Sequence, residues 1–262
     1  MRADQNAAIG KPNYDAFQGG PEAQVMDFVQ AGLSHFVLFD IDGTLLWSDG
    51  AGALAMRLAL AEVYGTAGAL GRISMAGMTD RAIVGQALSG GGLSRDEIQA
   101  GWEHFGLALA RHMAMTVVEC DVYPCLGVLA LLDALSARDD VLLGLVTGNL
   151  ENTAPIKLRA AGIDPRLFRA GGYGSDDGDR NKLPAIAAQR AEALTGRPFT
   201  GRDIVVVGDT PADVACGRAV GARTVAVATG SLPLEALQAA APDHLFLDLS
   251  NLESVLKVIL SR

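Results

Sequence analysis

The chain has 262 residues, half of them hydrophobic and 19% charged, so it is long and apolar enough to bury a large core. Its formal net charge of −9 argues against a nucleic-acid-binding protein, because affinity for a phosphate backbone depends on clustered lysine and arginine. No run of about 18 apolar residues occurs, so we expect no membrane-spanning helix. The three cysteines, Cys120, Cys125 and Cys216, predict neither a disulfide framework nor a metal site.

The first part of the chain, residues 1–32, is predicted to be an N-terminal extension. It is polar and interrupted by glycine and proline, with one short helical pattern over residues 22–31. It lacks the apolar core of a signal peptide, so we expect a cytoplasmic protein.

A buried strand is predicted over residues 36–39, which are aromatic, β-branched or otherwise apolar. The run ends in two carboxylates, Asp40 and Asp42, followed by Gly43 and Thr44. Two acids at the end of a buried strand are costly unless a cation or hydrogen bonds offset their repulsion. Because ligands bind outside the carboxyl ends of strands in open parallel sheets, the stretch predicts a strand that brings two acids to a ligand site.

Residues 49–119 carry helical patterns and little strand signal, which predicts an inserted all-helical cap. Its helices are expected over residues 53–64, 79–88 and 94–115. The second helix has Thr79 as its expected N-cap. The third begins at Ser94, where Glu97 three residues later completes a capping box.

From residue 128 onward, helix and strand patterns alternate with short connections. Helices are expected over residues 128–137, 152–161, 183–194, 212–220, 234–240 and 252–260. Strands are expected over residues 141–146, 167–170, 204–207, 224–227 and 245–247, with a loop over 171–179. This alternation predicts an α/β fold: a Rossmann-like, doubly wound parallel sheet formed by residues 33–48 and 120–262, with the cap inserted between them.

Polar side chains follow three of the predicted strands. They are Asp40 and Asp42 after the first strand, Thr147 and Asn149 after the strand 141–146, and Asp209 and Asp213 after the strand 204–207, with Arg180 and Lys182 on a loop between the last two. One carboxylate can attack phosphorus, and a second can protonate the leaving oxygen and then deprotonate water. A hydroxyl and a cation can hold phosphate oxygens, and two further carboxylates can hold Mg²⁺. The set therefore points to phosphoryl transfer.

These residues resemble the motifs of the haloacid dehalogenase-like hydrolase superfamily. The matching segments are Asp40-Ile41-Asp42-Gly43-Thr44, Thr147-Gly148-Asn149, the basic loop from Arg180 to Lys182, and Gly208-Asp209-Thr210-Pro211-Ala212-Asp213. They occur in the superfamily's order, over roughly residues 35–250, and the insertion is similar to the cap of the phosphoglycolate phosphatase-like branch. The resemblance implies a Mg²⁺-dependent phosphatase, monomeric or homodimeric, that hydrolyses a small phosphorylated metabolite such as phosphoglycolate or a sugar phosphate through an aspartyl-phosphate.

The resemblance also implies roles for single residues. Asp40 would be the nucleophile, and Asp42 would be the general acid and base. Thr147 would hydrogen-bond the transferring phosphoryl group, with amides of Gly148 and Asn149 nearby. The implied metal ligands are Asp40, the backbone carbonyl of Asp42, Asp209, and Asp213 directly or through water, and Gly43 and Thr44 are expected beside the substrate.

One departure from the branch concerns the phosphate-binding cation. That cation is commonly a lysine followed directly by proline, whereas here Lys182 is followed by Leu183 and then Pro184, with Arg180 upstream. Lysine is a compact point charge and arginine a bidentate fork, so the two would bind phosphate differently. Both stay open, with a slight preference for Lys182.

Asp42 favours a phosphatase over a dehalogenase, because an alkoxide leaving group needs a proton donor and a halide does not. We expect Asp42 to be protonated at the first step while Asp40 stays ionised. The alternatives are a β-phosphoglucomutase-like phosphomutase, a signalling receiver that accepts a phosphoryl group, and a non-catalytic binding protein. The receiver is disfavoured because such domains are much shorter and have no cap.

Two further patterns lie in or next to the cap. Gly50–Ala55 fits a dinucleotide-binding G-x-G-x-x-A pattern but starts well after the strand, so we expect a hinge into the cap instead. Thr79, Asp80 and Arg81 form a polar turn that either contacts the substrate or only begins a helix.

Overall fold

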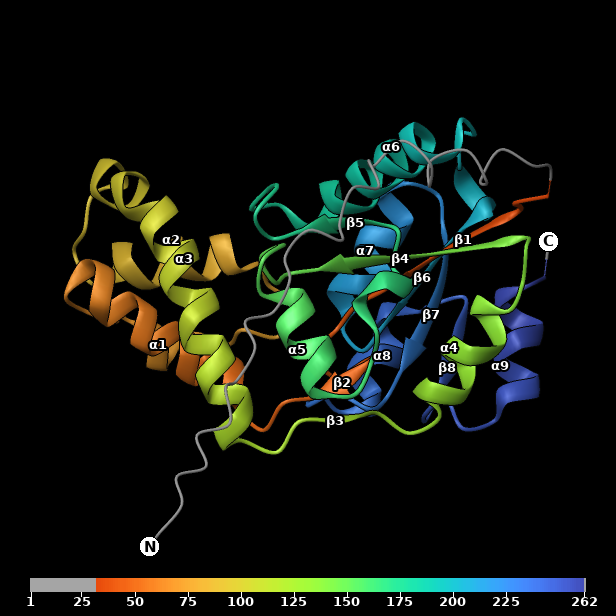
Figure 1. Cartoon of the computed structure of the whole chain (residues 1–262), viewed down its shortest axis with the longest axis horizontal. Coiled ribbons are helices and arrows are strands. Elements are labelled where there is room, and N and C mark those ends of the chain that lie inside the picture. The colour runs from red at the N-terminus through yellow and green to blue at the C-terminus, as the bar shows by residue number, and fades with distance from the viewer. Residues whose placement is uncertain (1–31, 262) are drawn as a thin grey trace, which may run out of the picture. The chain divides into compact units, whose positions relative to one another are not determined.

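The computed structural model describes residues 32–261, so the helix expected over 22–31 lies outside the described residues. A six-stranded sheet has the order β5-β4-β1-β6-β7-β8, and all of its neighbouring strands are parallel (Figure 1). The strands are β1 (His35–Phe39), β4 (Val141–Thr147), β5 (Ala170–Tyr173), β6 (Ile204–Gly208), β7 (Arg223–Val227) and β8 (His244–Phe246). Since β1 lies between β4 and β6, the residues that follow these three strands meet at one edge of the sheet.

Helices cover both faces of this sheet because the side chains of β1 alternate between them. Val37 and Phe39 pack with helices of one face, and Phe36 and Leu38 pack with helices of the other. The first face carries α4 (Val128–Ser136), α5 (Ala154–Ala160) and α9 (Leu252–Ile259), and the second carries α6 (Leu183–Thr195) and α7 (Pro211–Ala219), with α8 (Leu234–Ala240) beside α7. The predicted doubly wound α/β fold is confirmed.

The segment predicted to be the cap, residues 49–119, contains α1 (Ala51–Tyr64), α2 (Asp80–Gly90) and α3 (Arg95–Glu119). These helices share an apolar cluster of their own, which includes Leu60, Leu88 and Phe105. Ser94 and Glu97 form the expected capping box at the start of α3. Neither α3, with its 25 residues, nor any other described helix is long and apolar enough to cross a membrane. The boundary residues of the cap and the core remain a prediction.

A second sheet of two short strands was not expected. β2 (Leu46–Trp47) pairs antiparallel with β3 (Tyr123–Pro124), so the chain segments that enter and leave the cap are hydrogen-bonded to each other. Strands of two residues are too short to show a period in the sequence.

The strand expected over 167–170 is wrong in position. Residues Pro165–Leu167 form a 3-10 turn in which the Asp164 side chain accepts the Arg166 N–H, and the strand follows at 170–173. β5 has the sequence Ala-Gly-Gly-Tyr, which lacks the β-branched residues that mark a strand. Its glycine is required by packing, because a Cβ on Gly172 would lie 2.1 Å from the backbone oxygen of Leu183 in α6.

Candidate active site

Three buried carboxylates meet at the carboxyl edge of the sheet. Asp40 follows β1, Asp209 follows β6, and Asp213 lies in the first turn of α7. One oxygen of each lies within 4.8 Å of the others, and the three side chains belong to residues only 2–6% exposed. Such a group of oxygen donors matches the ligands that Mg²⁺ prefers.

The local sequence explains how the acids come so close. Thr210 is the N-cap of α7, and its side chain and that of Asp213 form a reciprocal capping box that fixes Asp213. Gly43 adopts a φ of +81°, and a Cβ there would lie 2.5 Å from a carboxylate oxygen of Asp209. Thr44 donates a hydrogen bond of 3.2 Å to the other oxygen of Asp209. Gly43 and Thr44 therefore shape the acid cluster from the turn after β1.

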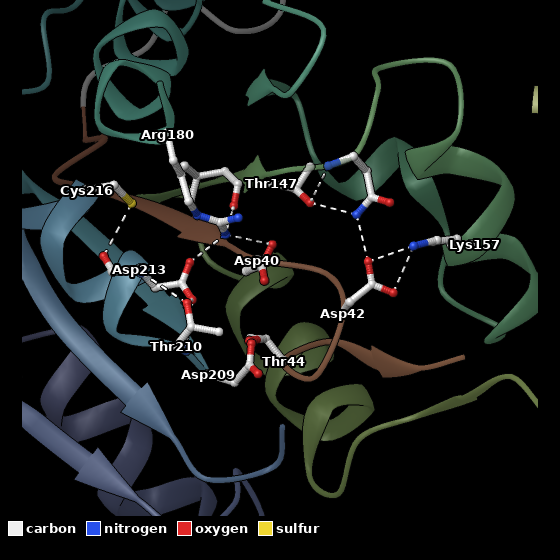
Figure 2. A network of polar contacts seen from close by, with 12 residues as sticks. Asp40, Asp42, Thr44, Thr147, Lys157, Arg180, Asp209, Thr210, Asp213 and Cys216 are labelled. Carbon is white, nitrogen blue, oxygen red and sulfur yellow. Dashed lines mark hydrogen bonds and ion pairs between the residues drawn. The ribbon is translucent and has the colours of Figure 1, made fainter. Parts of the chain in front are cut away.

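Arg180 is the cation that the fold brings to these acids (Figure 2). Its Nη2 lies 3.0 Å from Asp40 Oδ1 and 2.6 Å from Asp213 Oδ1, and its side chain is 8% exposed. Lys182 extends away from the acids, where it pairs with Asp177 at 2.8 Å with a side chain 60% exposed. The structure thus places Arg180 at the site and Lys182 outside it, contrary to the slight preference from the sequence.

Asp42 is held by a second set of contacts. Lys157 of α5 donates to both carboxylate oxygens at 2.7 and 2.9 Å, and Nδ2 of Asn149 donates at 2.8 Å. Ser48 adds a hydrogen bond of 3.2 Å. Figure 2 shows Lys157 and Arg180 approaching the site from opposite sides, one toward Asp42 and the other toward Asp40.

Lys157 is a residue that the sequence reasoning missed. A signal for it exists, because Ala154, Leu158 and Ala161 lie at helical spacing around it and all four residues are buried. A lysine on the buried stripe of a helix is uncommon without a partner. That partner is Asp42, which is far away in the sequence.

The loop after β4 contributes Thr147, Gly148 and Asn149. Thr147 Oγ1 accepts hydrogen bonds from the backbone and side-chain nitrogens of Asn149 at 3.3 and 2.9 Å. All three residues line the same cavity as Asp40 and Asp42. The fold therefore brings these predicted residues together with the acids.

The three residues of the polar turn in the cap, Thr79, Asp80 and Arg81, make different contacts. Asp80 lines the cavity and accepts a 3.1 Å hydrogen bond from the Leu150 N–H of the core. Thr79 caps α2 and donates to the carbonyl of Gly178, while Arg81 stacks over the Trp102 ring at 5.0 Å. Asp80 is the member of this turn that lines the cavity, and Gly50, with a φ of +81°, is the N-cap of α1 at the expected hinge.

The electrostatics of the two catalytic candidates differ from the expectation. Burial raises the pKa of Asp40 to about 6, against the opposing charge of Arg180. Burial would also raise the pKa of Asp42, but the charge and hydrogen bonds of Lys157 outweigh it and lower that pKa below its usual value. Burial and the charges of Asp213 and Asp40 raise the pKa of Asp209 well above its usual range. Without a cation, Asp42 is thus the more acidic of the pair, the reverse of the order a general acid needs.

A divalent cation fits this arrangement. Burial and crowding disfavour the negative charges of Asp40 and Asp209, and a positive charge between the three carboxylates would lower the pKa values of these two groups. The donor set consists of hard oxygens, and the surrounding residues are buried. The residues present therefore suit Mg²⁺.

Comparison with known proteins identifies the family of this chain. The family model of haloacid dehalogenase-like hydrolases matches residues 37–218, which include all of the acids described above. The chain belongs to this family. A phosphoglycolate phosphatase from Rhodospirillum rubrum is 32% identical over 204 residues, covering 74% of this chain and 79% of that protein. Membership in the family and this relative make the protein an enzyme of the phosphatase class in the phosphoglycolate phosphatase-like branch.

Solved structures share the fold at lower identity. A hydrolase from Pseudomonas syringae is 23% identical with a TM-score of 0.62, covering 87% of this chain and all of its own. CbbY from Rhodobacter sphaeroides, solved with phosphate, is 17% identical with a TM-score of 0.59, covering 84% of this chain and 96% of its own. These likenesses support the α/β fold of the chain.

Proposed function

We propose that the protein is a Mg²⁺-dependent phosphomonoesterase that hydrolyses a small phosphorylated metabolite through a covalent phosphoryl intermediate on Asp40. The observation that carries the proposal is the buried cluster of Asp40, Asp209 and Asp213, with Arg180 bonded to the first and the last. The relative named phosphoglycolate phosphatase supports the same reaction class and makes phosphoglycolate one substrate to test.

Mg²⁺ would be held by Asp40, Asp209 and the backbone carbonyl of Asp42. Asp213 already accepts hydrogen bonds from Arg180 and Thr210, so it would support the ion from beside Asp209. When bound, the ion supplies positive charge that neutralises the phosphoryl oxygens and the carboxylates around them. The residues of the chain carry the bond-making steps.

In the first step, a carboxylate oxygen of Asp40 attacks phosphorus while the bond from phosphorus to the ester oxygen breaks. Asp42 gives its proton to that oxygen, and an alcohol leaves. Arg180 and Thr147 lie beside Asp40, where their N–H and O–H groups can hold phosphoryl oxygens. In the second step, water attacks phosphorus, Asp42 takes its proton, and the bond to Asp40 breaks to release phosphate.

The two steps need Asp42 in different protonation states, so its pKa must change when substrate binds. In the structure Lys157 keeps Asp42 ionised, which is the form that the second step requires. The negative charge of a bound phosphate ester next to Asp42 would raise its pKa toward the protonated form of the first step. The contact with Lys157 thus keeps Asp42 in the form that acts as a base. Asp42 becomes an acid only in the complex with substrate.

The test is phosphate release from an aryl phosphate and a panel of small phosphate esters, with Mg²⁺ or with EDTA. Wild-type protein is expected to release phosphate only with Mg²⁺, and Asp40→Asn is expected to lose the activity. Asp133→Asn, an exposed position on α4, is the matched control and should behave as wild type. Fast isomerisation of a sugar phosphate with slow phosphate release would indicate a mutase, and no turnover at all would contradict the proposal.

A further inference from the structure

The cavity at the active site has a charged end and an apolar wall. Its volume is about 320 Å³, at the small end of the range for small-molecule sites, roughly 300–1,000 Å³. The core supplies the acids, Thr147, Lys157 and Arg180. The cap supplies the apolar wall, which consists of Met56, Met75, Met78, Ile83, Leu109 and Met113. Because the phosphoryl group must lie beside Asp40, the apolar wall faces the rest of the substrate.

The charges around the cavity leave no free cation for a second anionic group of the substrate. Among the described residues that line it, Lys157 is paired with Asp42, and Arg180 is paired with Asp40 and Asp213. The ionisable side chains that the cap brings to the cavity are both acids, the exposed Asp49 and the buried Asp80, and burial raises the pKa of Asp80 to about 7.

The basic residues of the cap lie elsewhere. Arg81, next to Asp80 in sequence, stacks on Trp102, and Arg111 pairs with Glu62. The remaining arginines of the cap, Arg57, Arg72 and Arg95, are exposed and do not line the cavity.

Resting on the proposed function, we infer that the alcohol released from the substrate is uncharged and largely apolar. A leaving group with a carboxylate, such as glycolate, would lose its hydration against methionine and leucine side chains and would face Asp49 and Asp80. An alkyl group would instead gain from burial, and the unbranched methionine side chains can adapt to its shape. The wall therefore selects against phosphoglycolate and in favour of alkyl phosphates of similar size.

The experiment compares kcat/KM for ethyl, propyl and butyl phosphate with that for phosphoglycolate, all with Mg²⁺. Alkyl esters are used because the basicity of their leaving oxygens is similar. We expect kcat/KM to rise by about four-fold for each methylene that the wall buries. Propyl phosphate should exceed phosphoglycolate by roughly ten-fold or more, because burying a carboxylate that has no cationic partner costs more than burying a methylene gains.

The outcomes separate this inference from the proposed function. If an aryl phosphate is hydrolysed with Mg²⁺ but phosphoglycolate equals or exceeds propyl phosphate, the inference fails and the phosphatase proposal stands. If no ester is hydrolysed, both fail. A rise along the alkyl series with phosphoglycolate as the poorest substrate supports both.

A matched pair of variants tests whether the wall is the cause. Met75→Lys places a cation in the wall at a half-buried loop position, and Leu107→Lys places the same charge on α3 at a residue 62% exposed outside the cavity. Met75→Lys should raise the ratio of kcat/KM for phosphoglycolate over propyl phosphate by roughly ten-fold, about the factor that one added ionic contact supplies. Leu107→Lys should leave that ratio unchanged. Equal ratios in a folded Met75→Lys protein and in the wild type would overturn the role of the wall.

Discussion

Asp42 carries two opposite demands, because the same carboxyl group must give a proton and later accept one. Its contacts with Lys157 and Asn149 favour the ionised form and fix the direction of its oxygens. Lys157 is only 4% exposed, whereas the Asp42 side chain is 42% exposed, so water reaches the pair from the Asp42 side. We therefore expect Lys157 to position Asp42 and to set the pH range in which it works.

Replacing Lys157 with methionine removes that charge and keeps the volume of the side chain. Burial would then raise the pKa of Asp42, so the limb of the pH–rate profile that Asp42 governs should move to higher pH. The direction is the same whether the acid step or the base step limits the rate. Because Asp42 also loses the contact that fixes its oxygens, we expect kcat at pH 7 to fall by roughly ten-fold or more, within the range for acid–base catalysis.

The control for this prediction is Lys182→Met, which removes an exposed lysine paired with Asp177 outside the site. It should leave kcat and the pH profile unchanged. An unshifted profile in Lys157→Met, or equal losses in the two variants, would contradict the positioning role.

Asp40 is expected to destabilise the metal-free protein at neutral pH. Its pKa rises from 3.8 to about 6 on burial, so the folded state binds a proton that the unfolded state has lost between these values. The contribution of Asp40 to the free energy of unfolding is therefore most favourable below pH 3.8 and is lost as pH rises through about 6. In EDTA at pH 7.5, Asp40→Asn should raise the free energy of unfolding by about 1–3 kcal/mol.

Urea denaturation at pH 7.5 and at pH 4 measures this difference. The gain should nearly vanish at pH 4, and Asp133→Asn, on the exposed face of α4, should show no gain at either pH. Lower stability of Asp40→Asn than of the wild type at pH 7.5 would show that the ionised Asp40 side chain does not destabilise the folded state.

The site residues that the sequence predicted lie mostly at strand ends, whereas those that it missed or left open lie on a helix or a 3-10 turn. Asp40, Thr147 and Asp209 directly follow or end strands, so their place follows from the parallel sheet. Lys157 reaches the site from the middle of a helix, and its partner is known only once α5 is packed. Lys182 and Arg180 are two residues apart on a 3-10 turn, so they point in different directions, and sequence spacing alone does not show which one faces Asp40.

At the scale of elements, the segment before α2 joins the cap to the core. A Cβ on Gly77 would lie 2.7 Å from the Cβ of Ala212 and 3.0 Å from Oγ1 of Thr210. The Asp80 N–H donates to the carbonyl of Gly148 at 2.7 Å, and a Cβ on Gly148 would lie 2.1 Å from the Met78 carbonyl oxygen. These close approaches hold the segment that brings Met75 and Met78 to the cavity lined by Asp40 and Asp209.

Gly77→Ala should therefore disturb catalysis as well as stability. Its φ of +73° costs about 1–2 kcal/mol for alanine, and the added methyl group would push the segment off Ala212. We expect kcat/KM to fall by roughly ten-fold, as for other displacements of groups that close over a site.

Gly65→Ala is the matched control, because Gly65 has a φ of +70° at the end of α1 and a Cβ there meets nothing within 4 Å. It should lose similar stability, measured by thermal unfolding, and keep the wild-type kcat/KM. Equal kcat/KM in the two variants would show that contact between this segment and α7 is not required.

The elements themselves were predictable where the pattern was long. The cap helices α2 and α3 begin at the capping side chains of Thr79 and Ser94, and the strands β1, β4 and β6 are continuous apolar runs. The predicted position of β5 was wrong because its small residues are required for packing against α6 and have low strand propensity. β2 and β3 pair across the whole length of the cap, so only the folded chain reveals them.

At the scale of the whole molecule, the core and the cap divide the work. The core brings the acids, Arg180 and Lys157 to one edge of the sheet, while the cap provides the apolar wall of the cavity. Family membership establishes the reaction class, and the wall is where this chain's own substrate preference is expected to lie. Transfer of the phosphoryl group to Asp40 is the step on which both parts depend.

The most direct test of that step is to stop wild-type turnover of an aryl phosphate with Mg²⁺ in acid, which preserves acyl phosphates, and to map the phosphoryl group by mass spectrometry of peptides. We predict added mass of one phosphoryl group on the peptide that contains Asp40, and none in Asp40→Asn. A phosphoryl group on another residue, or an unmodified Asp40 during rapid phosphate release, would contradict the covalent mechanism.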